Sequence, residues 1–381
     1  MRLLELTLAN FRNYEEATLD FADFNLIVGP NAQGKTNLLE AILFLATTRS
    51  HRSAADDELI REGEEVAYVA GTVEDAIARR RIEVTNVRRG RKQVRLDGKV
   101  QDRLSGLIGL LKVVFFAPES TSIVKGGPGE RRRFLDLLLS QVHGEYLLAL
   151  QRYHHALRQR NALLKQVREG RATRDHRDAW EPPLIEAGTV VIRYREAACR
   201  ELARILERQQ SYLTRGAEHA ALEYVPSVPP TGEDEALREA YATRLAAVRE
   251  NDLARGTTSV GPHRDDLQLR VNGADARRFA SQGQQRTLTL ALKLSEFDWI
   301  REKTDELPLF LLDDVTSELD EMRTGLLLEA LNELPPQVFL TTTRIDAAFY
   351  RGIPTRLFEI RAGTAKWVEK PGVGAPEEET R

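Results

Sequence analysis

One segment near the N-terminus, residues 29–36, constrains what this chain can fold into more than any other. It consists of Gly29, Pro30, Asn31, Ala32, Gln33, Gly34, Lys35 and Thr36, and so fits the pattern G-x-x-x-x-G-K-[ST] in full. The short apolar run 24–28 leads into it, and the stretch 37–45 after it is apolar nearly all round, which suits a buried helix. Because a strand before and a helix after are the context that confirms the pattern, the sequence predicts a phosphate-binding loop.

The chemistry of phosphate binding explains these residue types. Glycines let backbone N–H groups close around phosphate oxygens, and the N-terminus of the following helix adds the positive end of its dipole. Lys35 is expected to neutralise the β- and γ-phosphates of a nucleotide, and the Thr36 hydroxyl is expected to bind Mg²⁺.

A second apolar strand, expected at residues 308–312, ends in the carboxylates Asp313 and Asp314. Parallel strands that are buried on both faces read as continuous apolar runs, and ligands lie at their C-terminal ends. We therefore expect Asp313 to hold Mg²⁺, directly or through water. Asp314 is expected to orient or deprotonate the attacking water, so that Lys35, Asp313 and Asp314 form the candidate catalytic set.

Composition excludes several classes of protein. No run approaches the roughly 20 uncharged apolar residues of a membrane helix, and the N-terminus lacks the features of a secretory signal, which predicts a cytoplasmic protein. The single cysteine, Cys199, leaves no disulfide framework and no cysteine zinc site. A net charge of −3 indicates no bulk attraction to nucleic acid, although the 55 Lys and Arg residues can gather on one face. Basic runs at 79–81, 88–92 and 131–133 are also typical of solvated faces or hairpin tips.

Hydrophobic spacing divides the chain into a strand-rich head and a helical insertion. Strands are expected at 3–8, 17–21, 24–28, 267–271, 309–312 and 338–341, with a meander over 66–100. Helices are expected at 146–167, 185–214, 235–251 and 284–301. We expect an α/β head from residues 1–118 and 256–370, a helical lobe inserted at 119–255, and a disordered tail at 371–381.

A third motif lies at residues 280–286, Ala-Ser-Gln-Gly-Gln-Gln-Arg, just before an apolar helix. On its own, Ser281 is typical of a helix N-cap. The motif precedes the acidic strand by about 30 residues, and there it resembles the signature motif of ABC-type ATPases. In that family a serine and a glycine, here Ser281 and Gly283, contact the γ-phosphate held by a second subunit. Residues 317–320 resemble the D-loop of the same family.

Further segments narrow the resemblance to the RecF family of bacterial recombination mediators. In chain order these segments are 10–14, 29–36, 48–52, 124–126, 131–136, 261–266, 312–315 and 317–320. Because these segments extend from residue 10 to residue 320 and keep the order of that family, the resemblance covers nearly the whole chain. It implies an α/β fold with an ABC-ATPase head, SMC-like and containing the P-loop, that carries an inserted helical lobe in place of the long arms of SMC proteins.

The resemblance also implies a function, an ATP-dependent DNA-binding protein of recombinational repair. ATP, with Mg²⁺, would lie between the phosphate loop of one subunit and Ser281 and Gly283 of the other, so that ATP forms a homodimer on DNA. Hydrolysis, weak and DNA-stimulated, would release it. The family implies action at single-strand gaps or junctions with RecR and RecO as partners. There it would help to load recombinase, and it would support replication-fork recovery and the SOS response.

Several positions leave alternatives open. Asp314 stands where ABC-type ATPases usually have glutamate, and 341–343 are threonines where a switch histidine is expected, so hydrolysis should be slow. Arg12 either lies near the nucleotide phosphates, as in SMC-like heads, or is a surface arginine in a turn. Residues 116–119 contain no Q-loop glutamine. The same residues also leave open a nucleotide-binding subunit of a membrane transporter and an architectural SMC-type DNA-bridging protein.

Two smaller expectations concern histidines and arginines near these motifs. Arg49, His51 and Arg52 follow the phosphate-loop helix and, by the family resemblance, are expected to contact phosphate or adenine. His263 is expected to be a structural turn residue, because no second metal ligand stands at helical or strand spacing from it.

Overall fold

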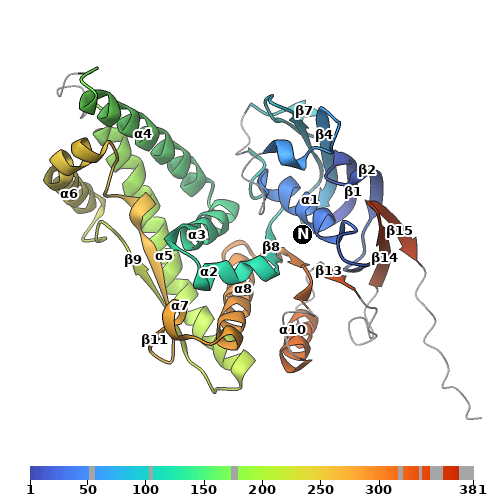
Figure 1. Cartoon of the computed structure of the whole chain (residues 1–381). Helices are drawn as coiled ribbons and strands as arrows, with labels where there is room; N and C mark the ends of the chain where they lie inside the picture. Colours follow the sequence, from blue (N-terminus) through green and yellow to red (C-terminus); the bar gives the residue numbers. More distant parts are fainter. Residues whose placement is uncertain are drawn as a thin grey trace, which may run out of the picture. The chain divides into compact units, whose positions relative to one another are not determined.

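The computed structural model describes residues 1–50, 56–102, 106–172, 179–315, 321–333, 337–343 and 355–368. The chain divides into two compact units. Figure 1 labels the helices and strands of both. The first unit comprises Met1–Pro118 and Glu306–Arg381, and the second comprises Glu119–Asp305. The expected tail at 371–381, the D-loop at 317–320, and His51 and Arg52 lie outside the described residues.

The first unit contains an antiparallel sheet with the strand order β2-β1-β4-β5-β6-β7. Its strands are β1 (Arg2–Phe11), β2 (Tyr14–Asp20), β4 (Val66–Glu74), β5 (Arg79–Val87), β6 (Gln93–Leu96) and β7 (Lys99–Val100). Along β1, Leu3, Leu6 and Leu8 are buried between more exposed neighbours, as expected for a sheet with one face in a core. The turn between β6 and β7 has positive φ at both Asp97 and Gly98.

A second sheet in this unit has the order β15-β14-β3-β13-β12-β8. Its strands are β3 (Phe24–Val28), β8 (Val113–Phe116), β12 (Leu309–Leu312), β13 (Val338–Thr342), β14 (Thr355–Arg361) and β15 (Thr364–Val368). The neighbours from β14 to β8 are parallel, and β15 is antiparallel. The predicted strands 24–28 and 309–312 are therefore confirmed as buried parallel strands.

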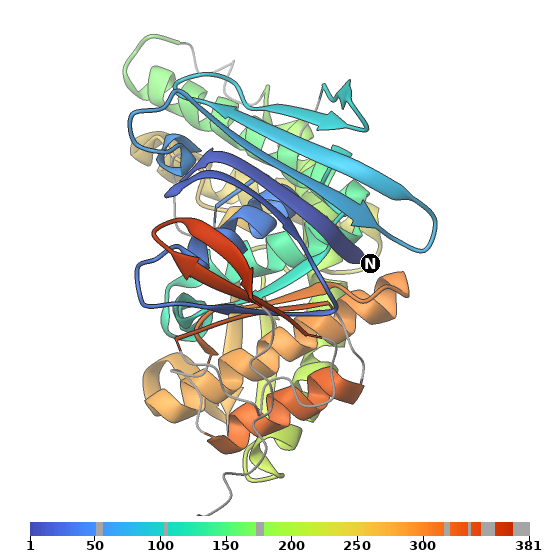
Figure 2. The ribbon, with the colours of Figure 1, turned by 90° about the vertical axis from the view of Figure 1, so that its right-hand side faces the viewer.

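Helix α1 (Lys35–Thr47) joins the two sheets into one core. Its side chains are buried nearly all round and belong to the same hydrophobic cluster as residues of both sheets. Figure 2 shows α1 between the long blue and cyan antiparallel strands and the orange and red strands of the second sheet. The short 3-10 helix η1 (Asp56–Leu59) and helix α10 (Glu321–Glu333) complete the described part of this unit. Because β3, β12 and β13 are parallel, their C-terminal ends meet at one edge, next to the N-terminus of α1.

The second unit is built from long helices and a small sheet. Its longer helices are α3 (Pro128–Val142), α4 (Gly144–Arg168), α5 (Glu181–Thr214), α6 (Asp234–Arg255) and α8 (Gln282–Thr304). Its shorter helices are η3 (Pro118–Thr121), which begins at the boundary, α2 (Ser122–Lys125), η5 (Pro262–Arg264) and α7 (Ala276–Phe279). Strands β9 (Ala220–Val225), β10 (Asp266–Val271) and β11 (Ala274–Asp275) form the sheet in the order β11-β10-β9. The helices predicted at 146–167, 185–214, 235–251 and 284–301 all appear.

The structure differs from the expected domain division at its second boundary. The first boundary falls at Pro118 in the structure, as in the expected division. Residues 256–305, however, belong to the second unit and not to the head. The reason is long-range pairing, since β10 pairs with β9 along its whole length and α8 packs against α5. The second unit consequently contains strands as well as helices, and it extends to Asp305, beyond the expected end of the helical lobe at residue 255.

Buried ion pairs hold the helices of the second unit together. Arg160 of α4 donates to Glu181 at 3.0 Å and to Asp252 of α6 at 2.9 Å. Arg195 of α5 donates to Asp136 of α3 at 2.7 Å. A buried charge is tolerated when partners and hydrogen bonds replace its water, and removing one partner is costly. In the described part of the chain, no helix is both long enough and apolar enough to cross a membrane.

Candidate nucleotide-binding site

The predicted phosphate loop lies where the sequence placed it, between β3 and α1 of the first unit. Gly34 is the N-cap of α1 and has φ of 115°, a conformation that glycine adopts without strain. A Cβ atom at this position would lie 2.7 Å from the side-chain amide of Asn13. Both the backbone conformation and the close approach of Asn13 therefore require glycine here.

The Lys35 ammonium lies inside the loop. It donates hydrogen bonds to the backbone carbonyls of Gly29, at 2.6 Å, and Pro30, at 2.9 Å. Burial lowers the pKa of Lys35, and the nearby charges of Asp314 and Asp313 oppose that shift. The two carboxylates therefore favour the charged ammonium, in a loop whose pattern is typical of phosphate binding.

Asp313 lies at the centre of a hydrogen-bonded group at the ends of the parallel strands. Its Oδ1 atom accepts from the Thr36 hydroxyl at 3.0 Å and from the Thr341 hydroxyl at 2.7 Å. Its backbone N–H donates to the Phe116 carbonyl at 2.8 Å, and its side chain is almost fully buried. Thr36 lies in the first turn of α1, Asp313 follows β12 and Thr341 belongs to β13, so three separate segments converge on one carboxylate.

The donor atoms at this point suit a hard divalent cation. A carboxylate oxygen and a hydroxyl oxygen are the ligands that Mg²⁺ takes in nucleotide sites, where it keeps waters and phosphate oxygens for the rest of its shell. Among the described residues there is no group of three or more His, Cys, Asp or Glu that could form an all-protein metal site. Thr36 and Asp313 therefore fit Mg²⁺ held together with phosphates better than a metal held by protein alone.

Asp314, the second predicted carboxylate, is held in an unusual backbone conformation. Its φ is 47°, in the left-handed region that non-glycine residues rarely occupy. Its backbone N–H donates to the Thr341 hydroxyl at 2.9 Å. Residues in such conformations cost about 1–3 kcal/mol and cluster at functional sites. Thr341 thus holds both acidic residues, accepting from Asp314 and donating to Asp313.

The loop is braced from two directions that sequence reasoning did not identify. Asn13 donates to the Gln33 carbonyl at 2.9 Å, and the Tyr14 hydroxyl donates to the Gly34 carbonyl at 3.0 Å. From the β14–β15 turn, the backbone N–H of Gly363 donates to the same Gln33 carbonyl at 3.0 Å. Asn13 and Tyr14 belong to the segment 10–14, which resembles the RecF family, but no pattern in residues 355–368 indicated a contact with the loop.

Arg12 pairs with a buried carboxylate of α1. Its guanidinium donates to Glu40 through Nε at 2.8 Å and through Nη2 at 2.9 Å, and through Nη1 to the Glu58 carbonyl at 2.7 Å. Glu40 has no exposed surface. The Ser50 hydroxyl, after α1, donates to the same carboxylate at 2.5 Å. Arg12 therefore connects the turn after β1 to α1, and its place near the nucleotide phosphates stays a prediction.

Ser281 is the N-cap of α8 in the second unit, as its residue type predicted. Its hydroxyl oxygen accepts from the Gln284 backbone N–H at 3.2 Å, and the Gln284 side chain accepts from the Ser281 N–H at 2.9 Å, which completes a capping box. Ser281 and Gly283 are both exposed. A Cβ atom at Gly283 would meet nothing nearer than the Ser281 hydroxyl at 3.9 Å, so packing within this chain does not explain the glycine.

Two further segments that resemble the RecF family, 131–136 and 261–266, meet inside the second unit. Arg131 and Asp266 form a bidentate ion pair at 2.7 and 2.9 Å. His263 Nδ1 lies 2.5 Å from the Tyr153 hydroxyl, and its Nε2 donates to the Thr258 carbonyl at 2.9 Å. Burial lowers the pKa of His263 to about 4. His263 is thus a neutral residue that fixes a turn, as predicted.

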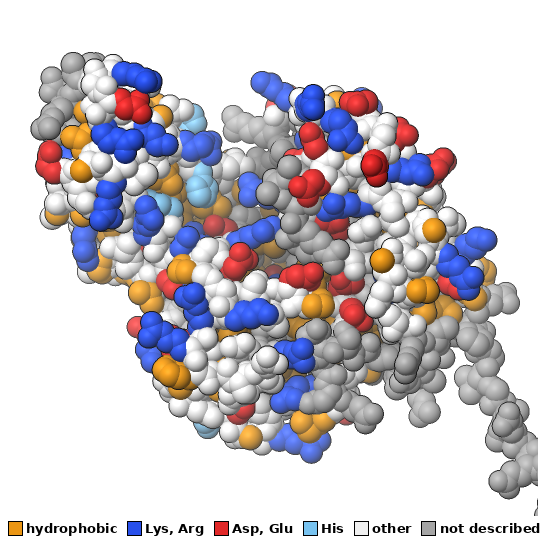
Figure 3. Space-filling model, viewed as in Figure 1, with side chains coloured by type: hydrophobic (Ala, Val, Ile, Leu, Met, Phe, Trp, Pro, Cys, Tyr) orange, Lys and Arg blue, Asp and Glu red, His pale blue; other side chains and the backbone are white. Residues whose placement is uncertain are grey.

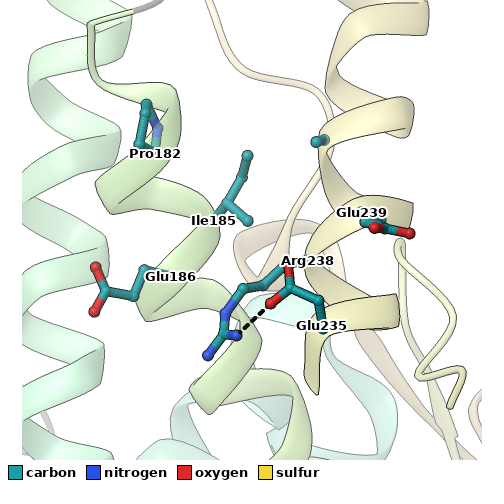
Figure 4. Close-up of a pocket in the computed structure, with 7 residues that line it drawn as sticks. Pro182, Ile185, Glu186, Glu235, Arg238 and Glu239 are labelled. Carbon is teal, nitrogen blue, oxygen red and sulfur yellow. Dashed lines mark hydrogen bonds and ion pairs between the residues drawn. The ribbon is translucent and has the colours of Figure 1, made fainter. Parts of the chain in front are cut away.

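A separate shallow pocket of about 460 Å³ lies between α5 and α6. Pro182, Ile185, Glu186, Glu235, Arg238, Glu239 and Ala242 line it. Figure 4 shows Arg238 paired with Glu235 of the same helix, an ion pair of 2.9 Å. The pocket contains none of the predicted site residues, and its three glutamates do not favour a phosphate ligand.

Comparisons with known proteins agree with this geometry. The family described as RecF/RecN/SMC N terminal domain matches residues 2–359. The DNA replication and repair protein RecF of Geobacillus thermodenitrificans (strain NG80-2) is 42% identical over 356 residues, which cover 91% of this chain and 94% of that protein. A solved structure of the recombination mediator protein RecF-ATP in the RecFOR pathway has a TM-score of 0.89 at 33% identity, covering 96% of this chain and 97% of that one.

A more distant match concerns the fold alone. The Smc head bound to the C-winged helix domain of ScpA has a TM-score of 0.54 at 16% identity, covering 97% of each chain. The predicted SMC-like ABC-ATPase fold is confirmed by these matches together with the strand–loop–helix and the parallel sheet described above. On the strength of the family match, the relatives and the shared structure, this chain belongs to the RecF family.

Proposed function

We propose that this chain is an ATP-dependent DNA-binding protein of recombinational repair, in which ATP drives dimerisation on DNA and slow hydrolysis reverses it. The observation that carries the proposal is the convergence of Lys35, Thr36 and Asp313 at the edge of the parallel sheet. Relatives named DNA replication and repair protein RecF, and a solved RecF-ATP structure in the RecFOR pathway, support the class of function.

Each residue of the site has a proposed role. The backbone N–H groups of residues 31–34 and the Lys35 ammonium bind the β- and γ-phosphates of ATP. Thr36 and Asp313 would hold Mg²⁺, which would supply charge neutralisation for the phosphates. Asp314 orients the attacking water and accepts its proton, because it is the carboxylate next to the metal ligand.

The hydrolysis step is expected to be slow for a structural reason. Asp314 is one methylene shorter than the glutamate usual in ABC-type ATPases, and its position depends on the Thr341 hydroxyl. A threonine hydroxyl does not gain a proton at neutral pH, so Thr341 cannot carry a positive charge to the γ-phosphate as a histidine can. We infer a weak, DNA-stimulated ATPase that acts as a switch for association.

Two features of α8 support a composite site in an ATP-bound homodimer. The Ser281 oxygen accepts the capping hydrogen bond, which leaves its O–H proton to donate to a phosphate oxygen, so the cap and the phosphate contact are compatible. Gly283 stands exposed in the first helical turn with open space around it. A missing side chain there permits close approach of a ligand held by another subunit.

The finer parts of the function follow from the family. We propose that the dimer acts in the cytoplasm at gaps or single-strand/double-strand junctions, and that it contacts DNA through its phosphates. RecR and RecO are the proposed partners in loading recombinase, with roles in replication-fork recovery and the SOS response. The RecFOR pathway of the solved relative supports this placement.

Sedimentation velocity tests the proposal. The protein is measured alone, with ATP and Mg²⁺, and with both plus either duplex or gapped duplex DNA; Lys35→Ala is the control. We expect a monomer without ATP, a dimer with ATP, and a dimer on DNA that the control does not form. ATP-independent DNA bridging would favour the architectural alternative, whereas no DNA binding together with a membrane partner would favour a transporter subunit.

A further inference from the structure

Helix α4 of the second unit has an unusual charge distribution. Residues 146–168 contain no Asp or Glu, yet they include Arg152, Arg158, Arg160, Lys165 and Arg168 and two adjacent histidines. Helix α6, by contrast, mixes both signs, for example Glu235, Arg238 and Glu239. Exposed helices of soluble proteins normally intersperse acids with bases. Figure 3 shows Lys, Arg and His side chains gathered over α4.

The cations divide between the two faces of α4 by helical spacing. Tyr146, Tyr153 and Leu164 are buried, and this face packs against α5 and α6. Arg160 lies on the buried face, where Glu181 and Asp252 neutralise it. Arg152, Arg158 and Lys165 lie on the opposite, exposed face, together with His155. We call these four residues the α4 face.

Three cations of the α4 face have no partner within the described part of the chain. Arg152, Arg158 and Lys165 make no side-chain hydrogen bond and no ion pair with any other described residue. Some other arginines of the second unit do pair, as Arg193 does with Asp234 at 3.0 Å and Arg200 with Glu196 at 3.1 Å. The cations of the α4 face therefore keep their donors available for an external anion.

We propose that the α4 face binds the sugar–phosphate backbone of DNA. The inference rests on the proposed DNA-binding function and names a surface for it. At a rise of 1.5 Å per residue, Arg152 and Lys165 are about 20 Å apart along the helix. Phosphates on one strand advance by about 3.4 Å per base pair, so the α4 face spans about six base pairs.

The chemistry of the α4 face favours DNA over an acidic protein. Specific protein interfaces have an apolar, aromatic-rich centre inside a polar rim. The four residues of the face carry no aliphatic or phenyl side chain, and the large exposed apolar residue described on this helix, Leu148, lies one turn before Arg152. Flexible cations without an apolar centre bind phosphates and do not read bases, so the binding should be independent of sequence.

The test is the salt dependence of duplex binding by the full chain with ATP and Mg²⁺. Each lost phosphate contact lowers the magnitude of the slope of log K against log[salt] by about 0.9. The triple variant Arg152→Ala, Arg158→Ala, Lys165→Ala should therefore lose about 2.7 from the slope and bind on the order of 10²–10³-fold more weakly at 0.1 M salt. Alanine favours helix, so far-ultraviolet circular dichroism should match the wild type.

Arg244→Ala provides the matched control. Arg244 is an exposed cation on α6, a helix that also carries acids, and its removal should leave slope and affinity unchanged. A triple variant with the wild-type slope would overturn the α4 face while leaving the proposed function standing. If the wild type itself binds no DNA, the proposed function fails instead. A triple variant that keeps its DNA affinity but loses an acidic protein partner would also overturn the inference.

Discussion

Replacing Thr341 by valine tests whether one hydroxyl holds both acidic residues of the site. The Thr341 hydroxyl donates to Asp313 at 2.7 Å and accepts from the Asp314 N–H at 2.9 Å, and the side chain is fully buried. Valine has nearly the same shape, so Thr341→Val removes these hydrogen bonds without opening a cavity. Any effect can therefore be assigned to the hydroxyl.

The expected magnitude follows from the two bonds. A hydrogen bond to a charged group contributes about 1.5–3 kcal/mol, and a buried N–H left without a partner costs about 1–3 kcal/mol. Because some relaxation is expected, Thr341→Val should destabilise the ends of β12 and β13 by about 2–4 kcal/mol. Asp314 would also lose the contact that holds its left-handed backbone, so hydrolysis should slow by tenfold or more, which corresponds to about 1.4 kcal/mol in the barrier.

Two assays separate these effects. Amide hydrogen exchange of peptides from β12 and β13 measures local stability, and single-turnover hydrolysis of bound ATP measures the chemical step. Thr341→Ser is the control, because it keeps the hydroxyl and loses one methyl group, and it should hydrolyse ATP at close to the wild-type rate. Wild-type exchange in both strands of Thr341→Val, with wild-type hydrolysis, would refute the reasoning.

Five further substitutions test the rest of the site and the second unit. Lys35→Ala should abolish ATP binding with a normal circular dichroism spectrum; normal ATP affinity, measured by calorimetry, would contradict the loop assignment. Asp313→Asn should weaken Mg²⁺-ATP binding, whereas Asp314→Asn should keep binding but prolong the ATP dimer; a wild-type single-turnover rate in Asp314→Asn would remove its role as base. Ser281→Arg should bind ATP but not dimerise, and the lost helix cap should lower the stability by about 0.5–2 kcal/mol. Mixing this variant with Lys35→Ala should restore part of the ATPase activity, whereas ATP-dependent dimers of Ser281→Arg alone would argue against a shared site. Burial lowers the pKa of His263 from 6.5 to about 4. As the pH falls, the unfolded state therefore binds a proton before the folded state does, so the stability of the second unit should be full above pH 6.5 and fall towards pH 4. Urea denaturation of His263→Gln should show a flatter dependence of stability on pH, and an unchanged dependence would exclude His263 as the source of the pH effect.

The candidate site could be predicted from sequence where its chemistry is local. Residues 29–36 form a loop between strand and helix because glycine conformations and flanking apolar runs are properties of neighbouring residues. Asp313 and Asp314 follow a strand whose apolar run marks it as buried on both faces. The capping box at Ser281 also follows from residues three positions apart.

Contacts between distant segments could not be predicted in this way. The backbone of Gly363 donates to the Gln33 carbonyl across about 330 residues, and a backbone donor leaves no mark in the sequence. Thr341 was noted as a departure from the ABC pattern, but its two hydrogen bonds depend on β13 lying beside β12. Arg12 could have paired with several acids, and only packing against α1 selects Glu40.

The same distinction applies to the whole chain. The sequence by itself determined the phosphate loop, the acidic strand end, the long helices and the family, because each depends on short-range periodicity or on ordered motifs. Tertiary structure decided that β9 pairs with β10 and that residues 256–305 therefore join the second unit. It also decided which cations of α4 are neutralised and which stay exposed, since Glu181 and Asp252 reach Arg160 from other helices. Such pairings are set by the packing of segments far apart in the chain, and residue type and spacing do not encode them locally.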